Sequence, residues 1–258
     1  MNRINQLFID NKNKKILSLY FCAGTPTLNG TAHVIETLEK KGISMIEIGI
    51  PFSDPMADGP VIQSAATKAL HNGMTLQKLF IQLKDIRKTV NIPLILMGYL
   101  NPIMQYGFEN FCKSCKGCGI DGVIVPDLPF NDYMKTYKPI AIKYDIRIIM
   151  LITPETSEER IHFIDDNTDG FIYMVSGASI TGAQKEFGEA KQAYFQRINA
   201  MNLRNPRMIG FGISNKQTLE SAQNNAAGAI IGSEFVTLID ENIDPEAAVE
   251  KLYEALKK

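Results

Sequence analysis

The stretch from Met45 to Pro60, MIEIGIPFSDPMADGP, decides the fold of this chain. It begins as a strand, because three isoleucines stand at every second position. Side chains along a strand point alternately to its two faces, so one face is all isoleucine while the other carries Glu47. Pro51 ends the strand, since proline cannot donate to a ladder, and an acidic loop then precedes a helical pattern. The order strand, loop, helix predicts a βα unit.

Two carboxyl groups in this stretch are candidates for acid-base chemistry. Glu47 lies inside an apolar strand, where an acid is costly unless it is partnered or protonated. A site that needs a proton donor or acceptor accepts that cost. Asp58 follows in the loop at the carboxyl end of the same strand. Together they predict a cleft in which two carboxyls divide the acid-base work.

Each carboxyl also has a purely structural interpretation. Glu47 could be an edge-strand residue that faces water, which does not suit a strand this apolar. Asp58 could cap the following helix or stabilise the turn before Gly59-Pro60, and the local sequence favours this as much as a catalytic role.

Composition excludes several classes of function. The 258 residues suit one α/β barrel or two smaller domains, with an ordinary 45% hydrophobic and 21% charged content. A net charge of -1 gives no electrostatic basis for binding nucleic acid or a membrane. The amino terminus has no apolar segment of signal-peptide length, and no run approaches a membrane span. We therefore expect a cytoplasmic protein.

Three of the four cysteines have a spacing that is also used for iron–sulfur ligation. Cys112, Cys115 and Cys118 read C-x-x-C-x-x-C. Residues at this spacing lie near one face of a helix, and Phe108 and Phe111 continue the same apolar pattern. Free cysteine is commonly buried as a small hydrophobic residue, so packing is the favoured interpretation and no metal is expected.

Strand and helix patterns alternate along the whole chain without a linker. Eight such units predict an α/β fold with a single domain over residues 1–258, the (β/α)8 or TIM barrel, with extra amino-terminal and loop helices. An open doubly wound sheet is the rival, but no G-x-G-x-x-G follows the first strand. The predicted strands are 16–22, 45–50, 94–99, 122–127, 147–152, 170–176, 207–212 and 227–232. The predicted helices are 5–9, 31–41, 61–72, 75–90, 104–117, 131–143, 157–166, 189–201, 215–224, one from 233 onward and 245–257, with Asn101-Pro102 as a turn.

Three loops after the last strands are rich in glycine and hydroxyl groups. They contain Thr181-Gly182, Phe211-Gly212 and Gly232-Ser233, and the last opens a helix. Glycine permits close approach of a ligand, and free N–H groups at a helix start bind anions. In a barrel, phosphate is often bound after strands seven and eight. One such loop could be only a tight turn, but three neighbouring loops predict a phosphate site.

The rest of the predicted pocket is apolar and lacks a covalent nucleophile. No lysine occurs inside a predicted strand, which argues against a Schiff base. Aromatic residues near the strand ends predict a ligand with a phosphate at one end and a flat apolar group at the other; these residues are Tyr20, Tyr99, Tyr173 and Phe211.

Over essentially its whole length the sequence resembles the tryptophan synthase alpha subunit family. The specific motif is EIGIPFSDPMADGPVIQ, supported by Asn101-Pro102, PDLP, SxxxxTG, GFGIS and IIGS. The resemblance implies a lyase that cleaves indole-3-glycerol phosphate to indole and glyceraldehyde 3-phosphate in tryptophan biosynthesis. It assigns proton transfer at indole C3 and at the glycerol hydroxyl to Glu47, and the indole N–H to Asp58.

The resemblance also implies a binding site and a partner. Phosphate would lie on the loop glycines and Ser233, with Tyr173 beside Glu47. The chain itself would need no cofactor, because pyridoxal phosphate belongs to a beta subunit that joins it in an alpha2-beta2 heterotetramer. The implied indole pocket is Tyr20, Tyr99, Ile124, Phe211 and Ile230. The implied phosphate site is Gly182, Gly212, Gly232 and Ser233, with Thr181 as a further substrate-binding residue. The implied interface includes Asp54, Pro55, Asn101 and Pro102.

The sequence departs from the common family pattern at a few positions. Gly177 stands where arginine is frequent, Ser179-Ile180 replace a usual Gly-Val, and Tyr20 replaces a phenylalanine. The changes at Gly177 and Ser179-Ile180 bear on closure of the loop after strand six and leave the reaction unaffected, and the change at Tyr20 is a mild one in the indole pocket. Two alternatives remain open at this point: a different phosphate-binding barrel enzyme, and a barrel without activity that regulates a partner.

Overall fold

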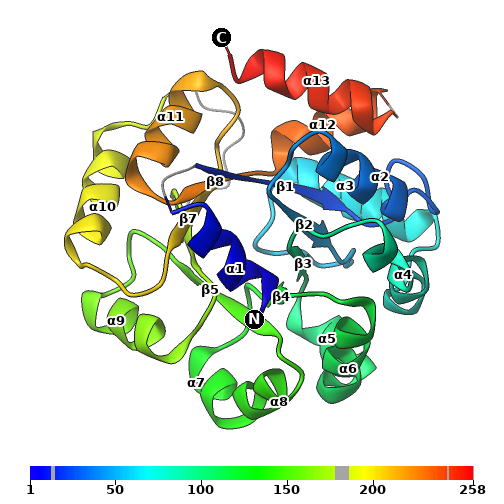
Figure 1. The fold of residues 1–258 in the computed structure, drawn as a ribbon, viewed down its shortest axis with the longest axis horizontal. Helices are drawn as coiled ribbons and strands as arrows, with labels where there is room; N and C mark the ends of the chain where they lie inside the picture. Colours follow the sequence, from blue (N-terminus) through cyan, green and yellow to red (C-terminus); the bar gives the residue numbers. More distant parts are fainter. Residues whose placement is uncertain (13–14, 178–185, 243, 258) are drawn as a thin grey trace.

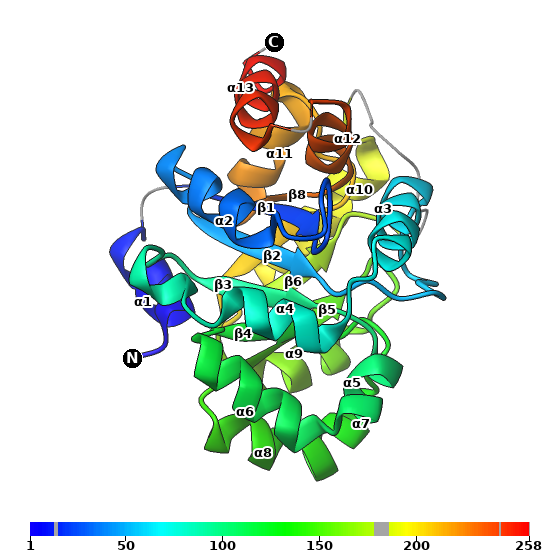
Figure 2. The ribbon, with the colours of Figure 1, turned by 90° about the vertical axis from the view of Figure 1, so that its right-hand side faces the viewer.

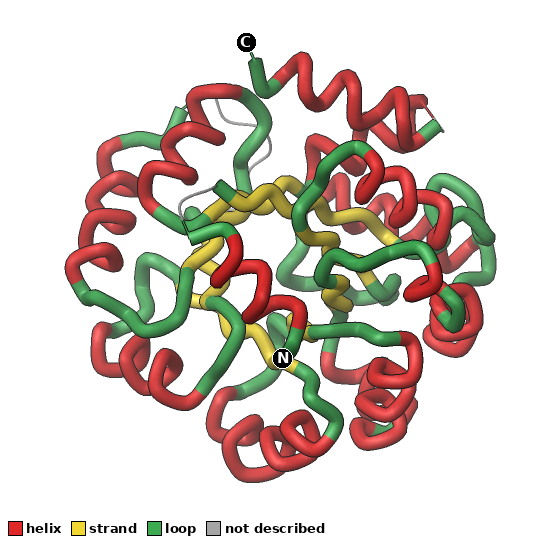
Figure 3. Tube along the Cα trace, viewed as in Figure 1, coloured by secondary structure: helices red, strands yellow, loops and turns green. Residues whose placement is uncertain are grey.

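Eight parallel strands form a closed barrel in which each strand pairs with the next and β8 pairs with β1. The computed structural model describes residues 1–12, 15–177, 186–242 and 244–257. Figure 3 shows the ring of strands inside a ring of helices. The predicted TIM barrel is confirmed. The strands are β1 Ile16–Cys22, β2 Met45–Gly49, β3 Leu94–Met97, β4 Gly122–Ile124, β5 Arg147–Ile152, β6 Ile172–Val175, β7 Arg207–Gly210 and β8 Gly228–Ile231.

The helices lie outside the barrel, as Figure 1 shows, and shield the strands from water. Thr75 and Asp244 begin α4 and α13 with side chains that accept a backbone N–H, as expected of capping residues. In the described part of the chain, no helix is long and apolar enough to cross a membrane. The helices are α1 Arg3–Asp10, α2 Thr31–Lys40, α3 Pro60–His71, α4 Leu76–Leu83, α5 Leu100–Tyr106, α6 Phe108–Cys118, α7 Phe130–Asp132, α8 Lys138–Lys143, α9 Glu158–Asn167, α10 Glu189–Ala200, α11 Lys216–Asn225, α12 Ser233–Asn242 and α13 Pro245–Ala255, with a 3-10 turn η1 Ile86–Lys88 and a π turn η2 Tyr133–Tyr137.

Helix α1 covers the end of the barrel at which the strands begin, opposite the loop between β2 and α3 (Figure 2). The side chain of Asn2 donates to the backbone oxygen of Asp121 at 2.9 Å. The buried Asp121 carboxylate is in turn bound by Arg87 at 2.5 Å and by Arg3 at 3.1 Å. This end is therefore closed by structural contacts, which leaves the opposite end for function.

The interpretation of Asn101-Pro102 as a turn is wrong, because both residues lie in the first turn of α5. Proline is tolerated there, since the first N–H groups of a helix have no partner inside it. The single helix predicted over 104–117 is two helices separated at Gly107, whose φ of 86° ends α5.

Other predicted elements are shorter or divided. Strand β4 ends at Ile124, shortly before Pro126, which has no N–H for the ladder. Strand β7 ends at Gly210, because Phe211 and Gly212 adopt positive φ angles of 71° and 75°. The helix predicted over 75–90 ends at Leu83 and continues as η1, and the helix predicted over 131–143 is divided into α7, η2 and α8.

The three closely spaced cysteines pack into the core. Cys112, Cys115 and Cys118 are buried on α6, and Cys118 contacts the backbone oxygen of Phe80 at 3.4 Å. Burial raises the pKa of the Cys112 thiol to about 12, so it stays protonated. Among the described residues, no cluster of three or more His, Cys, Asp or Glu side chains is arranged to hold a metal.

Candidate active site

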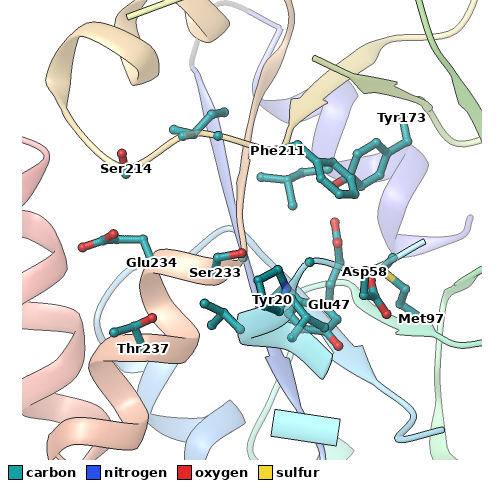
Figure 4. A pocket seen from close by; sticks show the side chains of 18 residues that line it. Tyr20, Glu47, Asp58, Met97, Tyr173, Phe211, Ser214, Ser233, Glu234 and Thr237 are labelled. Carbon is teal, nitrogen blue, oxygen red and sulfur yellow. The ribbon is translucent and has the colours of Figure 1, made fainter. Parts of the chain in front are cut away.

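A cavity of about 280 Å³ opens at the ends of the strands, between β2, β6, β7 and β8. Figure 4 shows Glu47 and Asp58 on one side of it, and Ser214, Glu234 and Thr237 on the other. Apart from these groups, most of its wall is apolar, as is usual for small-molecule sites. The lining residues are Tyr20, Glu47, Asp58, Gly59, Pro60, Val61, Ile62, Met97, Tyr173, Phe211, Gly212, Ile213, Ser214, Ile230, Gly232, Ser233, Glu234 and Thr237.

Glu47 is fully buried in the middle of β2, which pairs with strands on both sides, so it is not an edge-strand residue facing water. The Ser18 hydroxyl lies 3.4 Å from one carboxyl oxygen, and the other oxygen has no hydrogen-bond partner among the residues that the structure describes. Burial raises the pKa of Glu47 to about 8, against a smaller opposing effect of Ser18. The group is therefore mainly protonated at neutral pH and has one oxygen available to a ligand.

Asp58 is held in the loop before α3 by Tyr99. The Tyr99 hydroxyl donates to the Asp58 carboxyl at 3.0 Å and accepts the backbone N–H of Ala57 at 2.9 Å. The helix N-cap is Gly59, with no side-chain cap, so Asp58 does not have the capping role that its sequence context allowed. Burial raises the pKa of Asp58 to about 6, while the Tyr99 hydrogen bond lowers it. Asp58 is therefore mainly ionised at neutral pH.

Two tyrosines cross the barrel mouth over glycines of neighbouring strands. A Cβ atom on Gly49 would lie 2.1 Å from the Tyr20 hydroxyl, and one on Gly210 would lie 2.1 Å from the Tyr173 hydroxyl. Any larger residue at either position would displace a ring from the cavity wall. The Phe211 ring stands nearly edge-on to Tyr173, with 6.0 Å between the ring centres. The flat apolar part of the predicted pocket thus depends on these glycines.

The loops after β7 and β8 reach the same cavity. Ser176 fixes the first of them by donating to the backbone oxygen of Phe211 at 2.7 Å. Gly232 and Ser233 lie directly after β8, where α12 begins. Apart from its chain neighbours, the described atoms nearest to a Cβ on Gly232 would be those of Tyr20, at 3.9 Å. The backbone here is open to a ligand, as an anion site requires.

The structure brings most of the predicted site residues together. Tyr99 supports Asp58 from behind, and Ile124 is buried in β4 and is not among the lining residues. Thr181, Gly182, Ser179 and Ile180 lie outside the described residues. The cavity is also lined by residues that were not predicted as site residues, although their places at strand ends and helix starts could have indicated them: Met97, Ser214, Glu234 and Thr237.

The family model described as tryptophan synthase alpha chain matches residues 8–258. The chain belongs to the tryptophan synthase alpha family. The alpha chain of Phocaeicola vulgatus is 74% identical over 258 residues, with 100% of both chains covered. That of Bacteroides thetaiotaomicron is 68% identical over 257 residues, again with 100% of both covered. The family resemblance seen in the sequence is confirmed.

Solved structures agree with this assignment. The crystal structure of the alpha subunit from Legionella pneumophila has a TM-score of 0.89 at 34% identity, with 100% of this chain and 99% of that chain covered. A mutant alpha subunit from Pyrococcus furiosus has a TM-score of 0.83 at 34% identity, covering 94% of this chain and 97% of that chain. Members of this family cleave indole-3-glycerol phosphate to indole and glyceraldehyde 3-phosphate in tryptophan biosynthesis.

Proposed function

We propose that this cavity cleaves indole-3-glycerol phosphate, with Glu47 as acid and base and Asp58 as the partner of the indole N–H. One observation carries the assignment: two buried carboxyls line one cavity with pKa values of about 8 and about 6. At neutral pH one is protonated and the other ionised, which is the division of roles that the reaction needs.

In the proposed mechanism, protonated Glu47 first transfers its proton to indole C3. The positive charge that develops on the ring nitrogen is stabilised by the Asp58 carboxylate, which accepts the N–H hydrogen bond. Glu47, now ionised, removes the proton of the glycerol hydroxyl on the carbon that is bonded to indole C3. The carbon–carbon bond breaks, its electrons return to the ring as neutral indole, and the hydroxyl carbon becomes the aldehyde. Glu47 ends the cycle protonated.

The direct test is release of indole from indole-3-glycerol phosphate by the purified chain, with and without a beta subunit. Turnover that depends on the folded chain would support the proposal. A chain that binds phosphorylated ligands but releases no indole under either condition would point to a non-catalytic barrel. Turnover of another phosphorylated compound alone would point to a different barrel enzyme.

We place the substrate with its indole ring among the aromatic side chains and its phosphate on the loops after β7 and β8. Phe211, Tyr173 and Tyr20 supply the apolar wall, and Gly212, Gly232 and Ser233 face the same cavity. The free N–H groups at the start of α12 and the Ser233 hydroxyl are donors for phosphate oxygens. Ile230, Thr181 and Gly182 complete the proposed binding site, whereas Ile124, which the family resemblance placed there, is not among the described residues that line the cavity.

Placing a carboxylate on the proposed phosphate site should block substrate binding. Gly232→Asp introduces a like charge where the backbone has open space, and we expect a dissociation constant for glycerol 3-phosphate raised at least about tenfold. Calorimetric titration measures it. Gly117→Asp is the control, because Gly117 also has open space but lies on α6, away from the cavity. Equal affinity in both variants would place the phosphate elsewhere.

We also propose that the chain acts in the cytoplasm, holds no cofactor and docks on a pyridoxal-phosphate beta subunit in an alpha2-beta2 assembly. The end of the barrel that carries the cavity has exposed apolar groups. Met56, between β2 and α3, is 85% exposed, and Met104 on α5 is 46% exposed. Asp54 and Asn101 are exposed beside them, and Pro55 and Pro102 are half-buried. Such a patch at the cavity mouth suits a partner that receives indole directly.

Tyr99 connects this surface to the chemistry. It directly precedes α5, it stacks on Phe52 of the β2–α3 loop with 5.4 Å between ring centres, and its hydroxyl holds Asp58. A partner pressing on Asn101-Pro102 would therefore act on the position of Asp58 through one side chain. This supports the expectation that beta-subunit binding favours the closed loop and raises the cleavage rate.

The partner proposal predicts that the beta subunit from the same source forms a complex with this chain and accelerates cleavage. Met56→Asp should weaken the complex at least about tenfold, because it buries a charge in an apolar contact. Sizing and calorimetry measure this. Ile142→Asp, at a residue 64% exposed on α8, is the matched control and should bind as the wild type does. Absence of any complex, together with an unchanged rate, would rule the partner out.

A further inference from the structure

Acidic side chains line the cavity, but no basic side chain is found among its described lining residues. It has three carboxyl groups, those of Glu47, Asp58 and Glu234, whereas no Lys, Arg or His side chain of the described residues lines it. A phosphate group on the proposed site would therefore be bound by N–H and hydroxyl groups alone. Its negative charge would stay uncompensated by any described side chain of the cavity wall.

Glu234 lies on the same side of the cavity as the proposed phosphate site. It is the second residue of α12 and follows Ser233 directly, and it lines the cavity together with Ser214 and Thr237 (Figure 4). An acid in the first helical turn is favourable while the site is empty, because the N–H dipoles there attract negative charge. Once a phosphate takes those N–H groups, the carboxylate faces a like charge.

No cation offsets Glu234 in the described structure. Partial burial and the charge of the exposed Glu241 both raise the pKa of the Glu234 carboxyl. Helix α12 packs against α3, α13 and β1. The facing residue of β1 is the uncharged Tyr20. On the two helices, Lys68 pairs with Asp240, Lys251 donates to Asn242, and Glu246 and Glu250 pair with Lys41, while His71 and Glu254 lie near the carboxyl ends of α3 and α13.

We propose that Glu234 is the charge-selecting residue of the phosphate site: it takes up a proton when a dianion binds and repels the dianion while it remains ionised. This rests on the proposed placement of the phosphate. The protonated carboxyl adds a hydrogen-bond donor to the site, and the ionised form weakens binding and favours release of the phosphorylated product. Glu234 thus sets the pH range over which the phosphorylated substrate is held.

The sign of the pH dependence follows from linkage. Binding a dianion beside Glu234 raises its pKa further, so the bound state holds more protons than the free state. Affinity is then highest below the pKa of the free protein and falls as pH rises toward the pKa of the complex. Inorganic sulfate is the suitable probe, because its own charge does not change over this pH range, whereas phosphate titrates.

The experiment compares sulfate and glycerol 3-phosphate binding to the wild type, Glu234→Gln and Glu241→Gln by calorimetry. For the wild type, we expect proton uptake on sulfate binding, seen as a heat that depends on the buffer, and weaker binding at alkaline pH. Glu234→Gln should bind both ligands roughly tenfold more tightly at about pH 8 and lose the proton uptake. Glu241→Gln, on the same helix, should keep the proton uptake but move the pH dependence to lower pH, because it removes a charge that raises the pKa of Glu234.

Gly232→Asp distinguishes a failure of the proposed role of Glu234 from a failure of the proposed phosphate site. If it abolishes binding while Glu234→Gln leaves affinity and proton uptake unchanged, the phosphate site stands and the role of Glu234 is overturned. Proton uptake that persists in Glu234→Gln would assign the titration to Glu47 or Asp58 and would also overturn it. If Gly232→Asp binds sulfate as the wild type does, both the phosphate placement and the role of Glu234 fail.

Discussion

Glu47→Gln should abolish cleavage of indole-3-glycerol phosphate, with a loss in kcat of at least roughly a thousandfold. Glutamine has the shape of the acid but cannot give a proton to indole C3 or take one from the glycerol hydroxyl. Glycerol 3-phosphate should still bind, because the proposed phosphate site lies on the other side of the cavity (Figure 4). Single-turnover assays for indole, together with a ligand titration, measure both quantities.

The same variant should be more stable than the wild type at alkaline pH. The pKa of Glu47 is raised from 4.5 to about 8 on folding, so the folded state binds the proton more tightly than the unfolded state. The wild type therefore loses stability as pH rises through this window, by up to roughly 1.4 kcal/mol per pH unit. Glutamine does not titrate, so the variant does not lose stability in this way. The difference in unfolding free energy between the variant and the wild type should therefore widen as pH rises through this window.

Asp121→Asn gives the opposite result and serves as the control. Asp121 is also a buried acid, but it lies at the far end of the barrel and is paired with Arg87 and Arg3. Losing its charge should destabilise the barrel by about 3 kcal/mol while leaving turnover per folded molecule near the wild-type value. Substantial turnover by Glu47→Gln would end the acid-base assignment, and lower stability at alkaline pH would contradict the buried, protonated state.

The barrel could be predicted because its strands correspond to short apolar runs that recur along the sequence. Met45–Gly49 is buried at every position, and the sequence shows this as isoleucine alternation interrupted by a single acid. Glu47 was identifiable for the same reason, since an ionisable group in such a strand needs a function to explain its cost. The local sequence was therefore sufficient to predict a site residue where a single ionisable side chain interrupted a buried apolar strand.

Contacts between distant segments could not be predicted in this way. The hydrogen bond from Tyr99 to Asp58 joins two different loops, and the fit of Tyr20 over Gly49 joins two strands. Neither leaves a local pattern. The wrong prediction of a turn at Asn101-Pro102 also reflects the limits of local sequence, because proline is common both in turns and in the first turn of a helix. Glu234 was overlooked because an acid at a helix start has an ordinary dipole explanation.

Asp58→Asn should lower kcat by about a hundredfold or more in a properly folded barrel. The asparagine oxygen can still accept the Tyr99 hydroxyl, so the loop keeps its anchor. What is lost is the negative charge that offsets the positive charge developing on the indole nitrogen. The pKa of Asp58 is about 6, so wild-type kcat should fall as pH drops below this value, and the variant should lack that acidic limb. A pH profile of kcat measures both effects.

Tyr99→Phe is the matched test of how Asp58 is tuned. The Tyr99 hydroxyl lowers the pKa of Asp58 against the larger effect of burial, so its removal should raise that pKa and move the acidic limb to higher pH. Compared with the wild type at the same pH, the loss in kcat should then be smaller than in Asp58→Asn. It should narrow as pH rises from about 6 to about 8, because more of the Asp58 carboxyl is ionised there while Glu47 still holds its proton. Near-wild-type activity in Asp58→Asn would contradict the electrostatic role of Asp58. Helix capping would not then explain why an acid stands at this position, since the N-cap of α3 is Gly59.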